Sequence, residues 1–149
     1  MIKIINYQTG FEAQLREVFY TAIHQSGVQF YNQEQINAWA PAKFDLSSWS
    51  NRISKIKPFI ATIDDHVVGY ADVQSDGYID HFFVHGDYQS QGVGSALMEV
   101  IFKNKRPRYY SHVSLSAKDF FIKQGFNVAQ TQQASIGQQK LTNFLMKTS

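Results

Sequence analysis

The chain has 149 residues, of which 44% are hydrophobic and 15% aromatic, and its formal net charge is +2. This size suits a single domain, which we expect to span residues 1–149, with enough apolar side chains for a packed core. Cysteine is absent, which excludes disulfides, zinc–cysteine sites and thiol nucleophiles. No apolar run approaches the roughly 18 residues of a membrane helix, and the first residues lack the apolar segment of a signal peptide, so we expect a cytoplasmic protein with no membrane partner.

The densest basic cluster, residues 103–108, is the feature that could suggest nucleic-acid binding. No nucleic-acid motif accompanies this cluster, and cations suit the end of a helix, where the dipole is negative. We therefore expect no nucleic-acid partner.

Helical patterns dominate the chain before Pro58. A short strand is expected at residues 2–5. Thr9 with Glu12 three residues later forms a capping-box pattern that opens a first helix, which Gly27 can end. The spacing of apolar residues predicts two shorter helices, at 32–39 and around 46–53.

After Pro58, β-rich runs alternate with turns. Strands are predicted at 59–63, 67–73, 78–84, 109–115, 126–129 and 140–146, the last two around a Gln-rich loop. Short turns join the first three of these, which should be antiparallel. A long helix links 78–84 to 109–115, so these two strands should be parallel. The elements predict a mixed α/β fold with a twisted, mostly antiparallel sheet of about seven strands flanked by helices.

The segment Val84–Ile101 joins a predicted strand to a helix through a loop that contains Gly92 and Gly94. The first N–H groups of a helix lack internal partners and the helix dipole favours negative charge there, so this layout predicts a pyrophosphate site. A dinucleotide-binding motif is excluded because Leu97 stands at its third glycine. A triphosphate-binding loop is excluded because no Gly-Lys-Ser/Thr follows. The remaining alternative is that both glycines serve only a tight turn and close helix packing.

The chain resembles the GNAT superfamily of acyl-CoA-dependent N-acyltransferases in three motifs: Phe82-Phe83-Val84, Gln89-x-x-Gly92-x-Gly94 and Ala117-x-x-Phe120-Phe121-x-x-x-Gly125-Phe126. The resemblance implies acetyl-CoA as the co-substrate and a sheet splayed at the parallel pair beside it. It also implies that backbone amides of the loop bind the pyrophosphate and that the strand before the loop pairs with the pantetheine arm. The implied cofactor contacts are Phe82, Phe83, Val84, Gln89, Ser90, Gln91, Gly92, Val93, Gly94, Ser95 and Phe121.

Transfer of an acetyl group to an amine requires the neutral amine, and a lysine-like amine is only about 0.04% neutral at pH 7. A base near the acyl group is therefore expected. Asp80 is the first candidate, because it stands where some members of the family carry a catalytic glutamate and because a carboxylate in an apolar strand needs an explanation. Asp72 is the second, since it should lie opposite Asp80 or His81 across the Asp76-Gly77 turn. The alternative for both is a sheet-end ion pair or a solvated face.

The chain departs from the family at the group that protonates the leaving thiolate. Many members carry a tyrosine where this sequence has Phe121. Either no acid is used or another hydroxyl serves, and Ser116, Tyr110 and Tyr20 are the candidates. This departure also motivates an alternative function, a non-catalytic acyl-CoA-binding sensor or interaction module.

Acceptor recognition is expected from the aromatic segment 20–50, with Tyr20, His24, Tyr31 and Trp39 as the substrate-binding candidates. Aromatic rings suit a cationic or amphipathic amine, although the same rings could serve the core. No metal is expected, because the pair His81 and His85 lies on a strand and turn rather than on a helix. The primary hypothesis is an N-acetyltransferase that transfers an acetyl group from acetyl-CoA directly to a primary amine of a small molecule or peptide. The oligomeric state is open, and a homodimer is compatible with the sequence.

Overall fold

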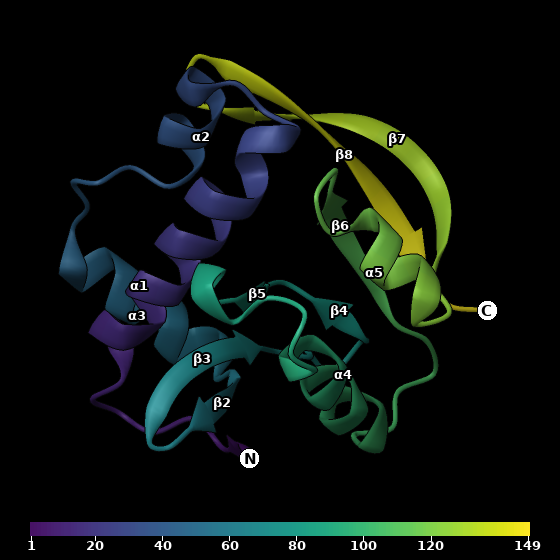
Figure 1. The fold of residues 1–149 in the computed structure, drawn as a ribbon. Coiled ribbons are helices and arrows are strands. Elements are labelled where there is room, and N and C mark those ends of the chain that lie inside the picture. The colour runs from purple at the N-terminus through teal and green to yellow at the C-terminus, as the bar shows by residue number, and fades with distance from the viewer.

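The computed structural model describes all residues 1–149, which form two four-stranded sheets covered by helices (Figure 1). The first sheet is antiparallel and has the strand order β1 (Ile2–Ile5), β2 (Phe59–Ile63), β3 (His66–Ala71) and β5 (Phe82–Val84). The second sheet has the order β4 (Tyr78–Ile79), β6 (Tyr110–Ser114), β8 (Gln139–Lys147) and β7 (Asn127–Ile136). Its β4 and β6 are parallel and its other pairs antiparallel. The predicted mixed α/β fold is confirmed.

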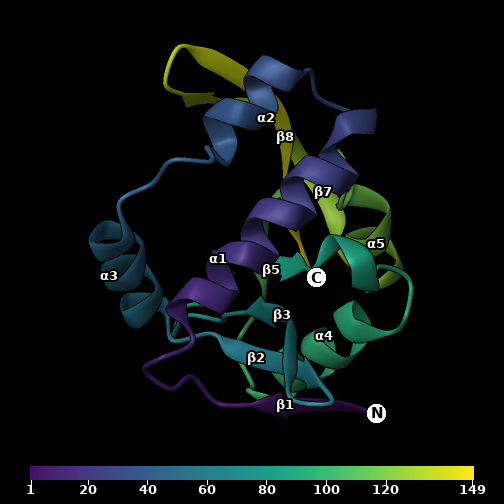
Figure 2. The same ribbon diagram turned by 60° about the vertical axis from the view of Figure 1, so that its left-hand side comes forward.

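The four helices predicted above are present, as α1 (Glu12–Thr21), α2 (Gln33–Trp39), α3 (Leu46–Ile56) and α4 (Val93–Lys103), and a fifth helix, α5 (Lys118–Lys123), follows β6. Helix α1 continues as a π-helical turn, Ala22–Ser26, and a 3-10 turn, Gly27–Gln29, before the chain reaches α2. Figure 2 shows α1 crossing the first sheet with α3 at its side. Helix α4 packs against β1, β2 and β3 of the same sheet. No helix is long and apolar enough to cross a membrane.

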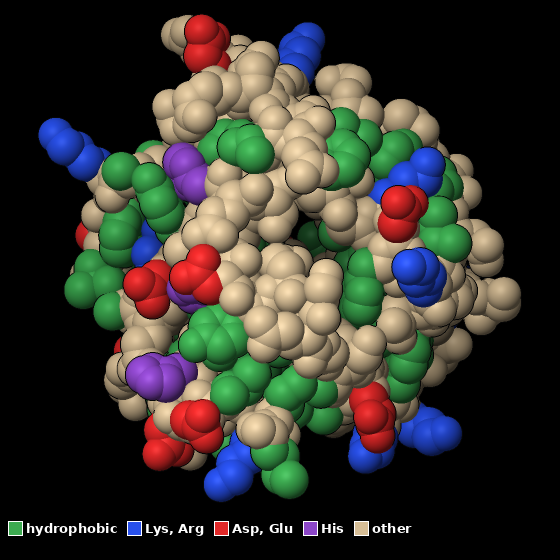
Figure 3. Space-filling view, viewed as in Figure 1, with side chains coloured by type: hydrophobic (Ala, Val, Ile, Leu, Met, Phe, Trp, Pro, Cys, Tyr) green, Lys and Arg blue, Asp and Glu red, His purple; other side chains and the backbone are tan.

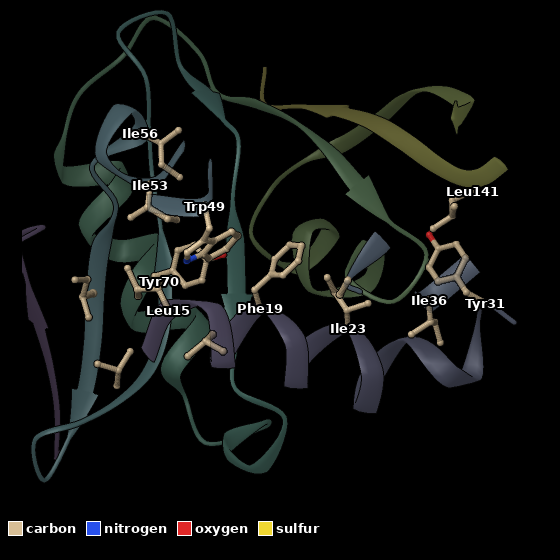
Figure 4. Close-up of a cluster of buried hydrophobic side chains, with 14 residues drawn as sticks. Leu15, Phe19, Ile23, Tyr31, Ile36, Trp49, Ile53, Ile56, Tyr70 and Leu141 are labelled. Atoms are coloured by element: carbon tan, nitrogen blue, oxygen red, sulfur yellow. The ribbon is translucent and has the colours of Figure 1, made fainter. Parts of the chain in front are cut away.

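The alternation of side chains along β2 and β3 divides the interior into two cores. Ile60 and Tyr70 point to the side of α1 and α3 and join a first cluster, part of which Figure 4 shows around Phe19. Ala61 and Ala71 point to the side of α4 and join a second cluster. The first sheet is therefore covered by helices on both faces.

The strand predicted at 78–84 is broken into β4 and β5, so the structure has eight strands where about seven were expected. The break falls at Asp80 and His81, whose N–H groups both bind Oδ1 of the buried Asp72, at 3.0 and 2.6 Å. Before the break, β4 pairs with β6. After it, β5 pairs with β3 in the other sheet. The parallel pair is thus splayed, as expected, and the outer edge of β5 has no neighbouring strand.

Two local predictions are wrong. The Gln-rich segment is not a loop, because β7 continues through it to Ile136 and pairs with β8. Its polar residues sit on an exposed edge strand and so show no hydrophobic alternation. The capping box at Thr9 does not form, because the helix begins after Phe11 and the Glu12 carboxylate accepts instead from the Gly10 N–H.

Candidate active site

The glycine loop leaves β5 through a 3-10 turn, Gly86–Tyr88, and enters α4 at Gly92. Gly92 has φ +88°, a left-handed conformation that glycine adopts without strain. The first internal bond of α4 runs from Ala96 N to Gly92 O, at 3.0 Å. The backbone N–H groups from Ser90 to Ser95 donate to no acceptor within the protein. Consecutive free donors at a helix start can hold an anion.

The open edge of β5 continues this row of free donors. The N–H of His85 binds Val68 O at 2.8 Å, and the N–H of Asp72 binds His81 O at 3.2 Å. In an antiparallel pair these bonds fall on every second residue, so the backbone groups of Phe82 and Val84 point away from β3. The Val84 carbonyl accepts from the Gln89 side chain at 2.7 Å, which ties the loop to the strand.

A groove of about 360 Å³ lies against the loop and β5. Of the predicted cofactor contacts, Phe82, Phe83, Val84, Gln89, Ser90, Gly92, Val93, Gly94 and Ser95 line it, whereas Gln91 and Phe121 do not. A Cβ added at Gly94 would meet the ring of Phe120 at 3.1 Å, so the glycine keeps the groove open beside this helix start. Figure 3 shows a hollow at the centre of the face on which β5 and β6 diverge. The groove therefore fits an extended ligand with an anionic group.

Phe121 lies behind the groove rather than in its wall. Its side chain is 2% exposed and packs edge-on against Phe82 and Phe126, at ring-centroid distances of 5.5 and 5.0 Å. The neighbouring Phe120 lines the groove instead. No proton donor stands at the position of Phe121.

A second and larger cavity of about 890 Å³ adjoins the groove, because three residues line both spaces. The residues that line both are Trp39, Phe83 and Ser114. The other walls of the cavity come from α1, α3, the loop before α3, the broken strand and the β7–β8 hairpin. Two ligands could therefore meet at this shared wall, one from each side.

Asp80 lies in the wall of the larger cavity with its side chain 20% exposed. Its two carboxylate oxygens accept from Arg52 Nη2 at 3.1 and 3.0 Å, so the ion pair considered as an alternative is present. Tyr78 stands beside it, with its hydroxyl 3.5 Å from Oδ1. Burial and, next, the charge of Asp80 raise the pKa of Tyr78 to about 12. That hydroxyl stays protonated and can donate.

Asp72 lies opposite Asp80 and His81, as the sequence predicts, and it lines neither cavity. Its side chain is fully buried, and its Oδ2 accepts from Gln74. Burial raises the pKa of this carboxyl to about 6, although its hydrogen bonds act in the opposite direction. The geometry places Asp72 behind the strand, where it holds the broken backbone.

His81 faces the larger cavity as a hydrogen-bond donor. Its Nδ1 lies 3.0 Å from the hydroxyl of Tyr70, which is fully buried and has no other partner. The hydroxyl must donate to Nδ1, because its hydrogen would otherwise be unsatisfied, and the ring proton then sits on Nε2. Burial lowers the pKa of His81 to about 4. The neutral ring therefore presents an N–H group.

Of the four predicted substrate-binding residues, Tyr31 and Trp39 line the larger cavity and Tyr20 and His24 line neither space. Tyr20 stacks on His24, whose Nε2 lies 2.7 Å from the Ala40 carbonyl. The Tyr31 hydroxyl donates to the Thr142 carbonyl at 2.6 Å and accepts from the Leu115 N–H at 2.9 Å. It thus joins the chain before α2 to the second sheet.

Of the three candidate acids, only Ser116 lines either space. Ser116 lines the groove, and its Oγ lies 3.0 Å from Oγ of Ser114. The Tyr110 hydroxyl donates to Asp76 away from both spaces. The structure thus places the hydroxyl groups of Ser114 and Ser116 side by side in the groove, and Ser114 also belongs to the shared wall.

Three residues at the cavity were missed from the sequence: Ser114, Arg52 and Arg16. Ser114 lies two residues after His112 on β6 and therefore on the same face of the strand, and both line the cavity. The period-2 pattern of the strand could have identified it. Arg16 stands next to the apolar face of α1, a position that needs an explanation for a charge. Arg52 carried no signal, because α3 and the broken strand meet only in the fold.

No group of three or more His, Cys, Asp or Glu side chains is arranged to hold a metal ion. His85 lies apart from His81, packed edge-on against Tyr88 and 3.9 Å from a carboxylate oxygen of Glu17.

Residues 28–142 match the acetyltransferase (GNAT) domain family. The chain belongs to this family of N-acetyltransferases. It is 34% identical to YafP, an uncharacterized N-acetyltransferase of Escherichia coli (strain K12), over 98% of this chain and 95% of that protein. A GCN5-related N-acetyltransferase from Rhodopseudomonas palustris has a TM-score of 0.93, with 29% identity over 99% of this chain and 94% of that one. The PaiA N-acetyltransferase of Thermoplasma acidophilum, solved in complex with coenzyme A, shares the fold with a TM-score of 0.78 and 18% identity over 100% and 99% of the two chains.

Proposed function

We propose that the protein transfers an acetyl group from acetyl-CoA directly to a primary amine of a small molecule or peptide. The observation that carries this proposal is the wall of Trp39, Phe83 and Ser114 that the groove and the larger cavity share. Acetyl-CoA supplies an acetyl group already activated as a thioester. Direct transfer needs both substrates at one point, and the shared wall supplies such a point.

The residues of the groove suit the cofactor. The free N–H groups from Ser90 to Ser95 would bind the pyrophosphate, where the start of α4 favours negative charge. The open backbone edge at Phe82 and Val84 would bind the pantetheine amides as an added strand does. The N–H groups on the open edge of β5 are also available to stabilise a developing oxyanion where β5 and β6 diverge.

Asp80 is the proposed base. A lysine-like amine is protonated at pH 7 by a margin of about 4.6 kcal/mol, and a positioned base typically supplies about 10²–10⁴-fold in rate. Asp80 faces the cavity from the strand break, three residues before Phe83 of the shared wall. Arg52 fixes the orientation of the carboxylate. Asp72 acts as a positioning residue, because its carboxyl holds the backbone of Asp80 and has no access to the cavity.

The surroundings of Phe121 support a second candidate, an acyl-CoA-binding sensor or interaction module without turnover. The ring is buried among other phenylalanines, so no acid stands where many members of the family carry one. In the enzymatic proposal, the hydroxyls of Ser114 and Ser116 take that place. Loss of turnover in the double Ser114→Ala, Ser116→Ala variant, with acetyl-CoA binding retained, would support them.

Isothermal titration with acetyl-CoA tests the cofactor assignment, and release of CoA with a panel of amines and peptides tests transfer. We expect Asp80→Asn to lower kcat/KM by about 10²-fold or more while leaving acetyl-CoA affinity unchanged. Asp65→Asn is the matched control, because Asp65 is exposed in the hairpin turn, where asparagine tolerates the positive φ. Wild-type turnover by Asp80→Asn would reject this base. Tight binding without turnover across the panel would favour the sensor.

A further inference from the structure

The larger cavity contains an arginine that has no anionic partner. Arg16, on α1, is 9% exposed and lines the cavity. Its guanidinium carbon lies 4.2 Å from the ring centroid of Phe44 and 4.9 Å from those of Phe19 and Trp49. A cation over an aromatic face is attracted by the negative charge density of the ring. The three rings fix the guanidinium in place without neutralising it.

The nitrogens of Arg16 leave one donor group open to the cavity. Nη2 donates to the Pro41 carbonyl at 2.9 Å. Nε is closed off from solvent and has no acceptor. Nη1 has no acceptor in the protein and is not closed off. No carboxylate lies within the 4.0 Å of a salt bridge. A buried cation without an anion costs several kcal/mol, which a bound anion would offset.

The other charged side chains of this cavity are already engaged. Asp80 pairs with Arg52. Asp45 accepts from the N–H of Ser47 at 3.0 Å and from the hydroxyl of Ser48 at 2.9 Å, so it serves as the cap of α3. Among the acidic and basic residues of the wall, Arg16 is therefore the one whose charge remains for a ligand.

Arg16 also lies within reach of the transfer point. The ring of Phe19 is 4.9 Å from the guanidinium carbon and 5.1 Å from the ring centroid of Phe83. Phe83 borders both the cofactor groove and the cavity. Two consecutive contacts thus span the distance from the guanidinium to the shared wall, a length that one small molecule can bridge.

We infer that the acceptor carries, besides its amine, an oxyanion group that Arg16 binds. This inference rests on the proposed function, because it places the amine at the shared wall and the anion at the guanidinium. The planar guanidinium matches both carboxylate and phosphate oxygens. The acceptor class is therefore an amino acid, a short peptide bound by its carboxylate, or an aminoalkyl phosphate.

Matched amine pairs test this class. L-lysine is compared with L-lysinamide for the carboxylate, and O-phosphoethanolamine with ethanolamine for the phosphate, by CoA release at saturating acetyl-CoA. We expect the KM of the anionic member of one pair to be at least about tenfold lower in the wild type, equivalent to 1.4 kcal/mol. Arg16→Gln should raise that KM to the level of the neutral member without changing acetyl-CoA affinity. Lys43→Gln, an equal charge change outside the cavity wall, should retain the preference.

A second measurement is independent of turnover. Glutarate and O-phosphoethanolamine are titrated against CoA-saturated protein, and the unfolding temperature is recorded for the wild type, Arg16→Gln and Arg16→Lys. Stabilisation that is lost in Arg16→Gln and partly kept in Arg16→Lys supports the anion site even if no amine is acetylated, which would overturn the proposed function alone. Acetylation of neutral and anionic amines with equal KM would overturn the anion site alone. A preference that survives in Arg16→Gln, or no stabilisation of the wild type by either anion, would also overturn it.

Discussion

Replacement of Asp72 by asparagine should stabilise the protein above pH 6. Burial raises the pKa of this carboxyl from 3.8 to about 6 in the folded chain. At 1.36 kcal/mol per pKa unit, this shift corresponds to about 3 kcal/mol. The unfolded chain releases the proton at lower pH, so the stability that the protonated carboxyl contributes is complete below pH 3.8 and is lost as the pH rises through 6. Asparagine cannot ionise, and its oxygen can still accept from the N–H groups of Asp80 and His81.

Urea unfolding between pH 4 and pH 8 measures this effect as the difference in unfolding free energy between Asp72→Asn and the wild type. We expect this difference to grow in favour of the variant by up to about 3 kcal/mol from pH 4 to pH 8. The variant must be compared with the wild type at each pH, because His81 makes the stability of both proteins depend on pH in the opposite direction. Its pKa is lowered to about 4, so both proteins lose stability as the pH falls from 6.5 towards 4. Asp65→Asn serves as the control for the substitution itself, because Asp65 is exposed in the turn between β2 and β3.

A difference that does not change with pH would refute the dominance of burial over hydrogen bonding at Asp72. An unfolding free energy of the wild type that increases relative to that of Asp72→Asn as the pH rises would contradict the reasoning more strongly. It would mean that the bonds from Asp80, His81 and Gln74 stabilise the carboxylate more than burial destabilises it. The pKa of the carboxyl in the folded protein would then lie below the ordinary 3.8 and not near 6.

Two other substitutions test the cofactor groove and the frame around it. Gly94→Ala adds a Cβ 3.1 Å from the Phe120 ring, so the Kd for acetyl-CoA measured by titration calorimetry should rise about tenfold, or 1.4 kcal/mol, and an unchanged Kd would argue against the loop as the cofactor site. Tyr31→Phe removes the hydroxyl that joins Leu115 to Thr142, so the unfolding free energy should fall by about 1–3 kcal/mol. Wild-type stability in that variant would show that water replaces the hydroxyl.

The elements with a strong local pattern were predictable from the sequence. Helix α4 has Val93, Leu97 and Ile101 at helical spacing, and all three are buried. The Asp76-Gly77 turn placed Asp72 opposite the strand break, and the structure confirms that position. Local periodicity and turn chemistry are encoded within a few residues, which is why they can be recognised without the fold.

Features that depend on contacts between distant segments were not predictable. The break between β4 and β5 requires a buried carboxylate, that of Asp72 directly after β3, to replace the strand bonds. The wall of the groove takes Phe120 rather than Phe121, a choice that depends on the rotation of the short helix α5 against β5. Tyr20 and His24 stack on each other outside both spaces, although their composition resembles that of a binding surface.

The walls of the two spaces are encoded mainly by different parts of the chain. The cofactor groove takes most of its residues from 82–95 and 114–123, whereas the larger cavity draws on 16–52 and 132–143, and the two have Trp39, Phe83 and Ser114 in common. Under the proposed function, substitutions in 16–52 and 132–143 would therefore alter which amine is accepted while binding of the acyl donor is preserved. A gene with this layout would acquire a new acceptor through changes that leave its source of acetyl groups intact.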